Sequence, residues 1–340
     1  MQAGNHIRYL QRREIDIARW DDCIAAAPNG LIYARSFYLD AMTAGQWDAL
    51  VLGDYNAVMP LPWRRKFGFY YLYQPDFIPA LGIFGSPVIH TLSASIPAST
   101  PANTPASTPA SIPAGTPVST PVSDFLGAIP QKFKFWEIDL NESNRIGDNP
   151  PSSIKVTNRL NSFLPLAKPY EDIYAAYKRL ARRMCKKALD EGLEVIRQVA
   201  PADIIGYYQK EYGHRHHKHT GSTYERLIAC AGIAHRNGNA AAYLARWPDN
   251  SIGAFYLVLS DDRFVYSLLG GSTSKGKEKG AFYLLTDAVI RDHASSDRIF
   301  RFEGSDIPGI AFFNTQFGPR PVHYPSLVMN NLPFPVNLFK

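Results

Sequence analysis

Two carboxylates near the end of the chain, Glu303 and Asp306, offer the clearest acid–base chemistry in the sequence. They follow a short apolar run that is typical of a strand, and a helical pattern begins soon after, near Pro308. A carboxylate in that position could take a proton from an attacking amine or hold the amine in place. The alternative is structural: Glu303 or Asp306 only caps the following helix, because Ser305 and Asp306 are residue types favoured at helix N-caps.

A second candidate is the Gly- and Lys-rich stretch GGSTSKGKEKG, which precedes a helix predicted over residues 281–293. Backbone N–H groups and the dipole at a helix N-terminus attract phosphate groups. This interpretation predicts a loop that binds the pyrophosphate of a cofactor through Lys275, Gly276, Lys277, Lys279, Gly280 and Ala281. Alternatively, lysines that alternate with glycines form only a flexible hairpin end.

A helix predicted over residues 170–191 separates its charged residues from its apolar ones. The apolar stripe consists of Ile173, Tyr177, Leu180, Met184 and Ala188. The opposite face carries Lys178, Arg179, Arg182, Arg183, Lys186 and Lys187. This face is either a solvated surface or a contact for the phosphates of a cofactor or an RNA, made by Arg182, Arg183 and Lys186.

Other reactive residue types form weaker patterns. The run HRHHKH at residues 214–219 has no carboxylate or Cys nearby, so we expect no metal site. Cys23, Cys185 and Cys230 are far apart and form no CxxC pair, which indicates buried, reduced thiols. There is neither a Walker loop nor a nucleophile elbow. We therefore expect no permanently bound cofactor.

The elements that must position these residues follow one plan that occurs twice. In the second half we predict strands at residues 193–198, 240–246, 252–259, 263–270, 298–303 and 322–328, and helices at 202–212, 222–237, 281–293 and 310–317. The first half repeats the order, with strands at 7–10, 48–52, 57–62, 67–73 and 133–140 and helices at 16–26, 36–44 and 124–129. A strand at 154–166 follows. The plan predicts an α/β (α+β) fold with a mixed, mostly antiparallel sheet and flanking helices in each of two domains, 1–152 and 153–340.

A four-residue repeat interrupts the first half. From Ile96 to Ser123 a proline stands at every fourth position, among Ala, Ser and Thr. Proline removes backbone donors and blocks helices and sheets, so residues 91–123 are predicted to be a disordered insert. The insert takes the position that the Gly- and Lys-rich stretch holds in the second half. We therefore expect the cofactor site and the active cleft in the second half.

Length and composition limit the protein class. With 340 residues, of which 46% are hydrophobic and 13% aromatic, the chain can fill two globular cores. A net charge of +6 suits a phosphorylated ligand but is small for a dedicated nucleic-acid-binding protein, so we expect no DNA partner. The sequence has neither a signal-peptide pattern nor an apolar segment long enough to span a membrane, which favours the cytoplasm.

Three segments resemble the FemABX-type branch of the acyl-CoA N-acyltransferase (GNAT) fold, a bacterial branch in which two GNAT-like domains are fused. They are RLARRMCKKALDEGLEV, the ending RFEGSDIPGIAFFNTQFGPRPVHYP, and AAPNGLIYARSFYLDAM followed by WDALVLGDYNAVMPLPWRRKFGFYYLYQP. The strand order of the second half is similar to the same fold. The resemblance covers nearly the whole chain outside the insert, and it implies two tandem GNAT-like domains.

The resemblance implies a transferase that moves an acyl or aminoacyl group to an amine acceptor. The donor is acyl-CoA in GNAT enzymes and aminoacyl-tRNA in the peptidoglycan-bridge enzymes, so we expect acyl-CoA as co-substrate, with tRNA as the alternative partner. Two departures from the GNAT pattern favour a third possibility, a non-catalytic binding protein. Phe282 occupies the last small position of the phosphate loop, and Phe312, Phe313 and Asn314 stand where many GNAT enzymes have a tyrosine that protonates the leaving thiolate.

Overall fold

The first half of the chain forms its elements in the order that its sequence predicts. The computed structural model describes residues 6–85, 122–147, 151–213, 220–303 and 307–339. The elements up to residue 139 are β1 (Ile7–Leu10), α1 (Ile17–Ala26), α2 (Ser36–Thr43), β2 (Trp47–Leu52), β3 (Ala57–Lys66), β4 (Phe69–Leu72), β5 (Phe84–Gly85), α3 (Val122–Gly127) and β6 (Phe133–Asp139). Short 3-10 turns lie at Arg12–Glu14 and Ile32–Ala34. These turns and β5 were not predicted; β5 pairs with Ala57 and Val58 of β3.

The second half also keeps its predicted order, with two differences. The helix predicted over residues 170–191 is divided into two helices, and an additional short helix precedes the one at residues 281–293. Its elements are β7 (Ile154–Pro165), α4 (Tyr170–Ala175), α5 (Arg179–Asp190), β8 (Glu194–Ile196), α6 (Pro201–Tyr212), α7 (Gly221–Arg236), β9 (Ala240–Arg246), β10 (Ile252–Ser260), β11 (Phe264–Ser272), α8 (Ser274–Lys279), α9 (Ala281–His293), β12 (Ile299–Arg301), α10 (Pro308–Thr315) and β13 (Arg320–Asn330). The α/β class with a mixed sheet and flanking helices is thereby confirmed.

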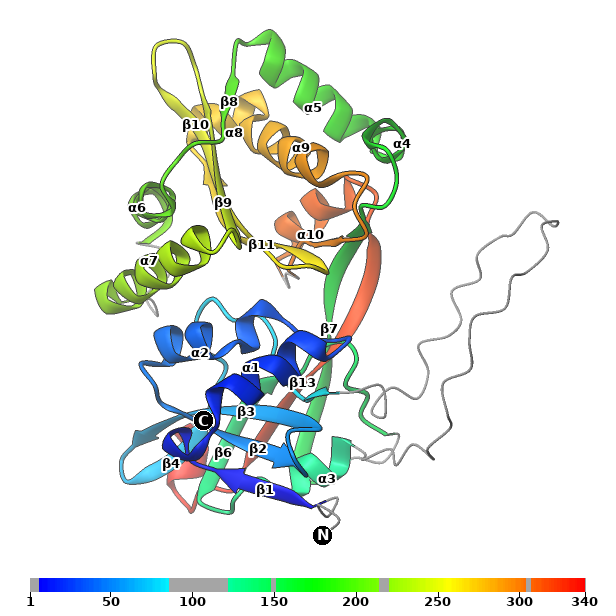
Figure 1. The fold of residues 1–340 in the computed structure, drawn as a ribbon. Helices are drawn as coiled ribbons and strands as arrows, with labels where there is room; N and C mark the ends of the chain where they lie inside the picture. The colour runs from blue at the N-terminus through cyan, green and yellow to red at the C-terminus, as the bar shows by residue number, and fades with distance from the viewer. Residues whose placement is uncertain (1–5, 86–121, 148–150, 214–219, 304–306, 340) are drawn as a thin grey trace, which may run out of the picture.

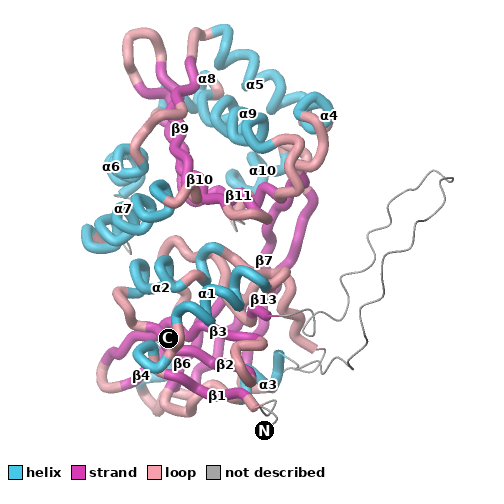
Figure 2. The backbone as a smooth tube through the Cα atoms, viewed as in Figure 1, coloured by secondary structure: helices cyan, strands magenta, loops and turns pink. Residues whose placement is uncertain are grey.

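One sheet runs through both halves of the molecule (Figures 1 and 2). Within the described residues it has thirteen strands, in the order β1-β2-β3-β4-β6-β13-β7-β12-β11-β10-β9-β8, with β5 attached to β3. Neighbouring strands are antiparallel except for two parallel pairs, β4 with β6 and β11 with β12. Each half thus contains the same arrangement, a four-stranded antiparallel run (β1–β4 and β8–β11) followed by a parallel neighbour.

The halves are joined by a long antiparallel ribbon of β7 and β13 (Figure 1). Its register pairs residues 154–163 of β7 with residues 320–329 of β13. The far end of β13 also pairs with β6 of the first half, from Ser326 to Asn330, whereas β7 pairs with β12 of the second half. The last strand of the chain therefore completes the sheet of the first half. β6 lies before the predicted domain boundary between residues 152 and 153, and it is hydrogen-bonded to β13, which lies after that boundary. The boundary itself stays a prediction.

Three hydrophobic clusters fill the layers between the sheet and its helices. One cluster is shared by the two halves: α2 of the first half contacts α7 of the second. Trp20, Tyr33 and Trp47 belong to the same cluster as Leu227 and Phe255. A second cluster lies between α5, α9 and the opposite face of β9–β12. A third lies beneath β2–β6, against α3. The shared cluster ties the halves to each other through apolar packing as well as through the ribbon.

The helix predicted over residues 170–191 is interrupted. Residues 176–178 leave the helix, and the backbone of Lys178 is extended. Its N–H donates to the carbonyl of Gln316, at 2.8 Å, instead of continuing the helical pattern. The buried face of the helix also differs from the predicted apolar stripe. Ala181 and Cys185 are buried, whereas Leu180 and Met184, which were predicted in the stripe, are only half-buried.

The Gly- and Lys-rich stretch is also a helix rather than the predicted loop. The Thr273 side chain caps α8 by accepting a hydrogen bond from the Gly276 N–H, at 3.1 Å. Gly280 then adopts φ +80°, a left-handed conformation that glycine tolerates, and separates α8 from α9.

The Pro-rich array lies between β5 and α3 in the sequence. Residues 86–121, which include most of the array and the segment before it, fall outside the described residues. The last two residues of the array, Val122 and Ser123, begin α3, two positions earlier than predicted.

Candidate active site

The candidate site lies where two parallel strands part. Strands β11 and β12 are paired at Phe264–Ile299, Val265–Phe300 and Tyr266–Arg301, and there β12 ends. β11 continues beside β10 to Ser272. Glu303 follows two residues after the last paired position, and its role as a site residue stays a prediction.

Glu303 is held in an unusual and buried conformation. Its φ is +47°, a left-handed value that residues with side chains seldom adopt, and its side chain is 6% exposed. The Asn161 amide of β7 donates to Oε2 at 3.0 Å, and the Arg301 Nε donates to Oε1 at 3.2 Å. Burial raises the pKa of Glu303 above its ordinary value of 4.5; Arg301 and Asn161 reduce this rise. A carboxylate with a raised pKa is better suited to act as a base near neutral pH.

Arg301 connects Glu303 to the first half of the chain. Its guanidinium is 1% exposed and forms a two-pronged ion pair with Glu142, at 2.7 and 3.2 Å, just after β6. Phe163, Phe264 and Tyr266 surround it at 4.7–5.8 Å from their ring centroids. Burial opposes the charge of Arg301, but Glu142 and Glu303 raise its pKa, so the guanidinium stays charged. A cation surrounded by aromatic rings is thus paired with two carboxylates.

Glu142, Asn161 and Arg301 were not predicted as site residues. Arg301 carried a signal in the sequence, since the alternation Phe-Arg-Phe-Glu places a cation inside a buried strand. Glu142 and Asn161 carried none, because they lie 159 and 142 residues from the side chains that they contact. Asp306, the second predicted catalytic carboxylate, and Ser305 lie outside the described residues, as do the histidines at residues 214–219.

The predicted phosphate-binding residues lie on α8 and at the start of α9. Lys279 pairs with Glu191 at 2.5 Å, and the Lys275 ammonium lies 4.0 Å from the Trp247 ring centroid. Lys277 is exposed and has no ion pair within the described part of the chain. Gly276 and Gly280 pack tightly against backbone: a Cβ would lie 1.8 Å from the Gly253 carbonyl oxygen and 2.5 Å from the Met184 carbonyl oxygen, respectively. Ala281 is buried. No ligand is present, and the phosphate role of these residues stays a prediction.

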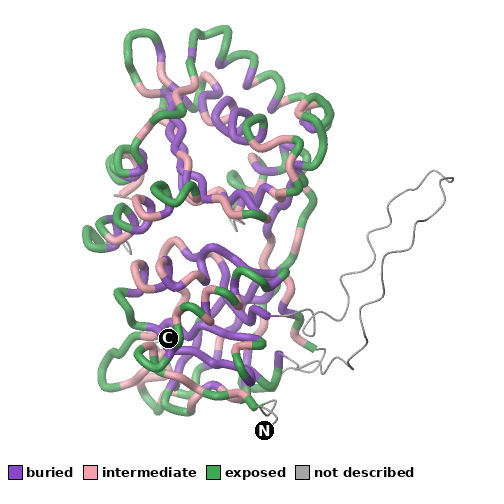
Figure 3. The backbone as a smooth tube through the Cα atoms, in the orientation of Figure 1, coloured by how far each residue is buried: buried purple, intermediate pink, exposed green. Residues whose placement is uncertain are grey.

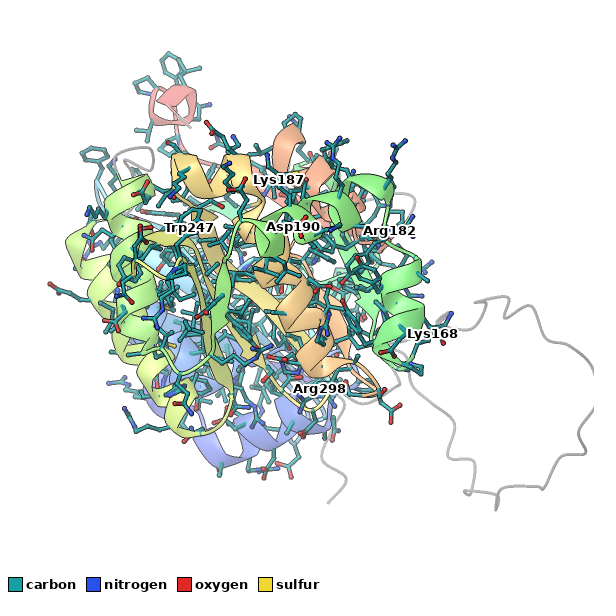
Figure 4. The ribbon with its side chains drawn as sticks, turned by 90° about the horizontal axis from the view of Figure 1, so that it is seen from above. Lys168, Arg182, Lys187, Asp190, Trp247 and Arg298 are labelled. Carbon is teal, nitrogen blue, oxygen red and sulfur yellow. The ribbon has the colours of Figure 1, made fainter. Side chains whose placement is uncertain are left out.

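The basic face of α5 is exposed, as predicted (Figure 3). Figure 4 shows Arg182, Lys187 and Asp190 along this helix. A shallow depression of about 390 Å³ is lined by Arg183, Lys186, Lys187, Asp190 and Glu191. Lys186 pairs with Asp190 at 3.1 Å. Among the described residues, neither Arg182 nor Arg183 forms an ion pair, which leaves these two charges available to a ligand.

The three cysteines form no disulfide bond, and burial raises the pKa of their thiols. Cys185 and Cys230 are buried and Cys23 is half-buried. Burial raises the pKa of Cys23 to about 11 and that of Cys230 to about 12, so both thiols stay protonated near neutral pH.

The described residues contain neither a cluster of metal-ligating side chains nor a helix that could span a membrane. No three His, Cys, Asp or Glu side chains in this part of the chain come together as metal ligands do. None of its helices combines the length and the apolar composition needed to cross a bilayer.

Comparison with known proteins identifies the fold. No protein-family model matches the chain, and no curated protein sequence matches it. Among solved structures, FemX aligns with a TM-score of 0.62 and 12% identity, over 95% of this chain and 98% of FemX. A conserved protein of unknown function from Bacteroides thetaiotaomicron aligns with a TM-score of 0.55 and 9% identity, over 96% of this chain and all of that one. The chain therefore has the fold of FemX, in agreement with the FemABX-type fold that its sequence motifs resemble.

Proposed function

We propose that this protein transfers an acyl or aminoacyl group to an amine, with Glu303 as the general base. The observation that carries the proposal is the Glu303 carboxylate, buried with a raised pKa at the point where β11 and β12 part in a FemX-like fold. Such a group suits amine acylation because the attacking nitrogen must lose a proton to become a neutral amide.

The proposed reaction uses few protein groups. The amine nitrogen attacks the carbonyl carbon of a thioester or an ester, and a carbon–nitrogen bond forms. The nitrogen gives its proton to Glu303, and the carbon–sulfur or carbon–oxygen bond breaks as the leaving group takes up a proton. Arg301 and Asn161 orient the carboxylate through the hydrogen bonds described above. Glu142 holds Arg301 in place.

Acyl-CoA is the proposed donor. The support is Lys277, whose charge is unpaired within the described residues beside the N-terminus of α9. An aminoacyl-tRNA is the second candidate donor, supported by Arg182 and Arg183 on the exposed face of α5. The proposed acceptor is a small molecule or a peptide with a free amine.

The test measures thiol release from a panel of CoA thioesters in the presence of amine acceptors, with the full-length protein. We expect Glu303→Gln to lower the rate by roughly 100-fold or more, because a general base contributes about that factor. Glu225→Gln, at an exposed position on α7, is the matched control and should keep the rate. Equal rates for the wild type and Glu303→Gln would contradict the assignment of the base.

The donor is distinguished by two further variants. If acyl-CoA is the donor, it should raise the melting temperature, and Lys277→Glu should abolish the rise; Lys279 is left intact because it pairs with Glu191. If aminoacyl-tRNA is the donor, binding should weaken steeply with salt and require Arg182 and Arg183. The absence of transfer with every CoA thioester and with aminoacyl-tRNA would favour a non-catalytic binding protein.

A further inference from the structure

Tyr33, in the first half of the chain, has a buried hydroxyl without a hydrogen-bond partner. The residue lies in the turn Ile32–Ala34 between α1 and α2, and its side chain is fully buried. Within the described part of the protein no atom donates to or accepts from the hydroxyl. Leaving a buried hydroxyl unpaired is unfavourable, so folding alone gives no reason for a tyrosine here instead of phenylalanine.

The unpaired hydroxyl belongs to the surroundings of Glu303. The Tyr33 ring lies edge-on to the Tyr266 ring, with centroids 5.0 Å apart. Tyr266 is the β11 residue paired with Arg301, and its ring also faces the Arg301 guanidinium. Burial raises the pKa of Tyr33, and the negative charge of Glu303 raises it further, so the hydroxyl remains protonated and can only donate or accept a hydrogen bond.

The turn that carries Tyr33 is fixed to the second half. The Ile32 N–H donates to the Tyr266 hydroxyl at 3.2 Å, and that hydroxyl donates to Asp261 at 2.5 Å. A second ring, Tyr38, packs edge-on against Tyr33, with centroids 5.3 Å apart. The position of the Tyr33 ring is therefore set by contacts from both halves before any substrate binds. A donor fixed in this way requires no reorganisation during a reaction.

We propose that Tyr33 completes the active site from the first half of the chain, by donating a hydrogen bond to the oxygen that becomes negative when the amine attacks the acyl carbon. This inference rests on the proposed acyl transfer. The carbonyl π electrons move onto the oxygen as the carbon–nitrogen bond forms, and they return when the leaving group departs. Tyr33 keeps its proton throughout, so the step needs no other reactant. Glu303, which follows β12, and Tyr33, from the turn before α2, would then act on the same reaction.

The test compares Tyr33→Phe with Tyr38→Phe. Both variants remove one hydroxyl from a buried ring, but the Tyr38 hydroxyl donates to the Phe77 carbonyl at 2.8 Å, whereas that of Tyr33 has no partner. We expect Tyr33→Phe to lower kcat by roughly 100-fold, as loss of one oxyanion donor does, with little change in KM. Its melting temperature should stay the same or rise. Tyr38→Phe should show the opposite pattern, an unchanged kcat and a lower melting temperature.

The outcomes separate this inference from the proposed function. If the wild type is active and Tyr33→Phe is equally active, the role of Tyr33 is overturned while acyl transfer stands. If the wild type is inactive with every donor, acyl transfer is overturned, and the proposed role of Tyr33 with it. A melting temperature that falls as far for Tyr33→Phe as for Tyr38→Phe would show that the Tyr33 hydroxyl has a structural role, and that too overturns the inference.

Discussion

Glu303 combines backbone strain with side-chain burial. A non-glycine residue with φ near +47° costs on the order of 1 kcal/mol or more, and a buried carboxylate adds a desolvation cost. The neighbouring structure imposes both, because Phe302 packs into the core and its N–H donates to the Ser162 carbonyl at 3.0 Å. Unfavourable features that surrounding contacts maintain are concentrated at functional sites.

The raised pKa of Glu303 predicts how stability depends on pH. The folded state favours the protonated carboxyl, so the contribution of Glu303 to the free energy of unfolding is greatest below its ordinary pKa of 4.5 and declines as the pH rises through the raised value. Glutamine cannot ionise. The difference in unfolding free energy between Glu303→Gln and the wild type should therefore shift in favour of the variant as the pH rises above about 4.5.

Urea unfolding at several pH values measures this difference. Its expected size is about 1.4 kcal/mol for each unit by which the pKa of the folded state exceeds that of the unfolded state. A constant offset from altered contacts with Arg301 does not affect the result, since only the change with pH counts. Glu225→Gln serves as the control. A shift in favour of the wild type with rising pH would show that Arg301 outweighs burial.

At the residue scale, the sequence predicted the position of Glu303 after a strand, but it did not predict the side chains that contact Glu303. The end of a short strand before a helix is a local pattern, and Glu303 could be found from it. Arg301, Glu142 and Asn161 come together only because β7 lies between β12 and β13 in the sheet. That arrangement depends on pairing across more than a hundred residues, which neither composition nor spacing indicates.

Most elements were predictable because hydrophobic periodicity is local. β9 at Ala240–Arg246 and α9 at Ala281–His293 have the predicted bounds, and the other predicted helices and strands in the described residues agree closely, apart from the helix over residues 170–191. That helix failed because a tertiary hydrogen bond from Lys178 to Gln316 replaces a helical one. The helix α8 was missed because glycines weaken helices, and here the cap from Thr273 and packing on β10 overcome that weakness.

Two glycines on different helices should respond to alanine in opposite directions. In α8, a Cβ on Gly276 would lie 1.8 Å from the Gly253 carbonyl oxygen, so Gly276→Ala should lower the free energy of unfolding by about 1–3 kcal/mol. In α6, Gly206 is exposed and a Cβ would meet no atom within 4 Å, so Gly206→Ala should raise it by about 0.5–1 kcal/mol.

Denaturant unfolding of both variants measures these effects. If Gly276→Ala proves as stable as the wild type, α8 does not pack on β10 as closely as the structure has it. A matching loss of the melting-temperature response to acyl-CoA in Gly276→Ala would support the proposed phosphate contact at α8.

At the scale of the molecule, the ribbon of β7 and β13 predicts that the halves are not independent. A fragment of residues 1–152 lacks β13, the strand that pairs with β6, and it loses the packing of α2 against α7 and the second half's part of the shared hydrophobic cluster. We expect this fragment to be unfolded by circular dichroism. Co-expression with residues 153–340 is the control and should restore a folded complex. Cooperative thermal unfolding of 1–152 alone would contradict the prediction.

The position of β13 also has a consequence for synthesis of the protein. The first half leaves the ribosome early, but the edge of β6 has no neighbour until residues 326–330 emerge. During translation, an incomplete sheet with an open edge must wait for nearly all of the second half. Unpaired strand edges recruit other strands, so nascent chains on a crowded polysome are at risk of pairing with one another. Binding of a chaperone to the nascent first half would protect that edge until β13 has emerged.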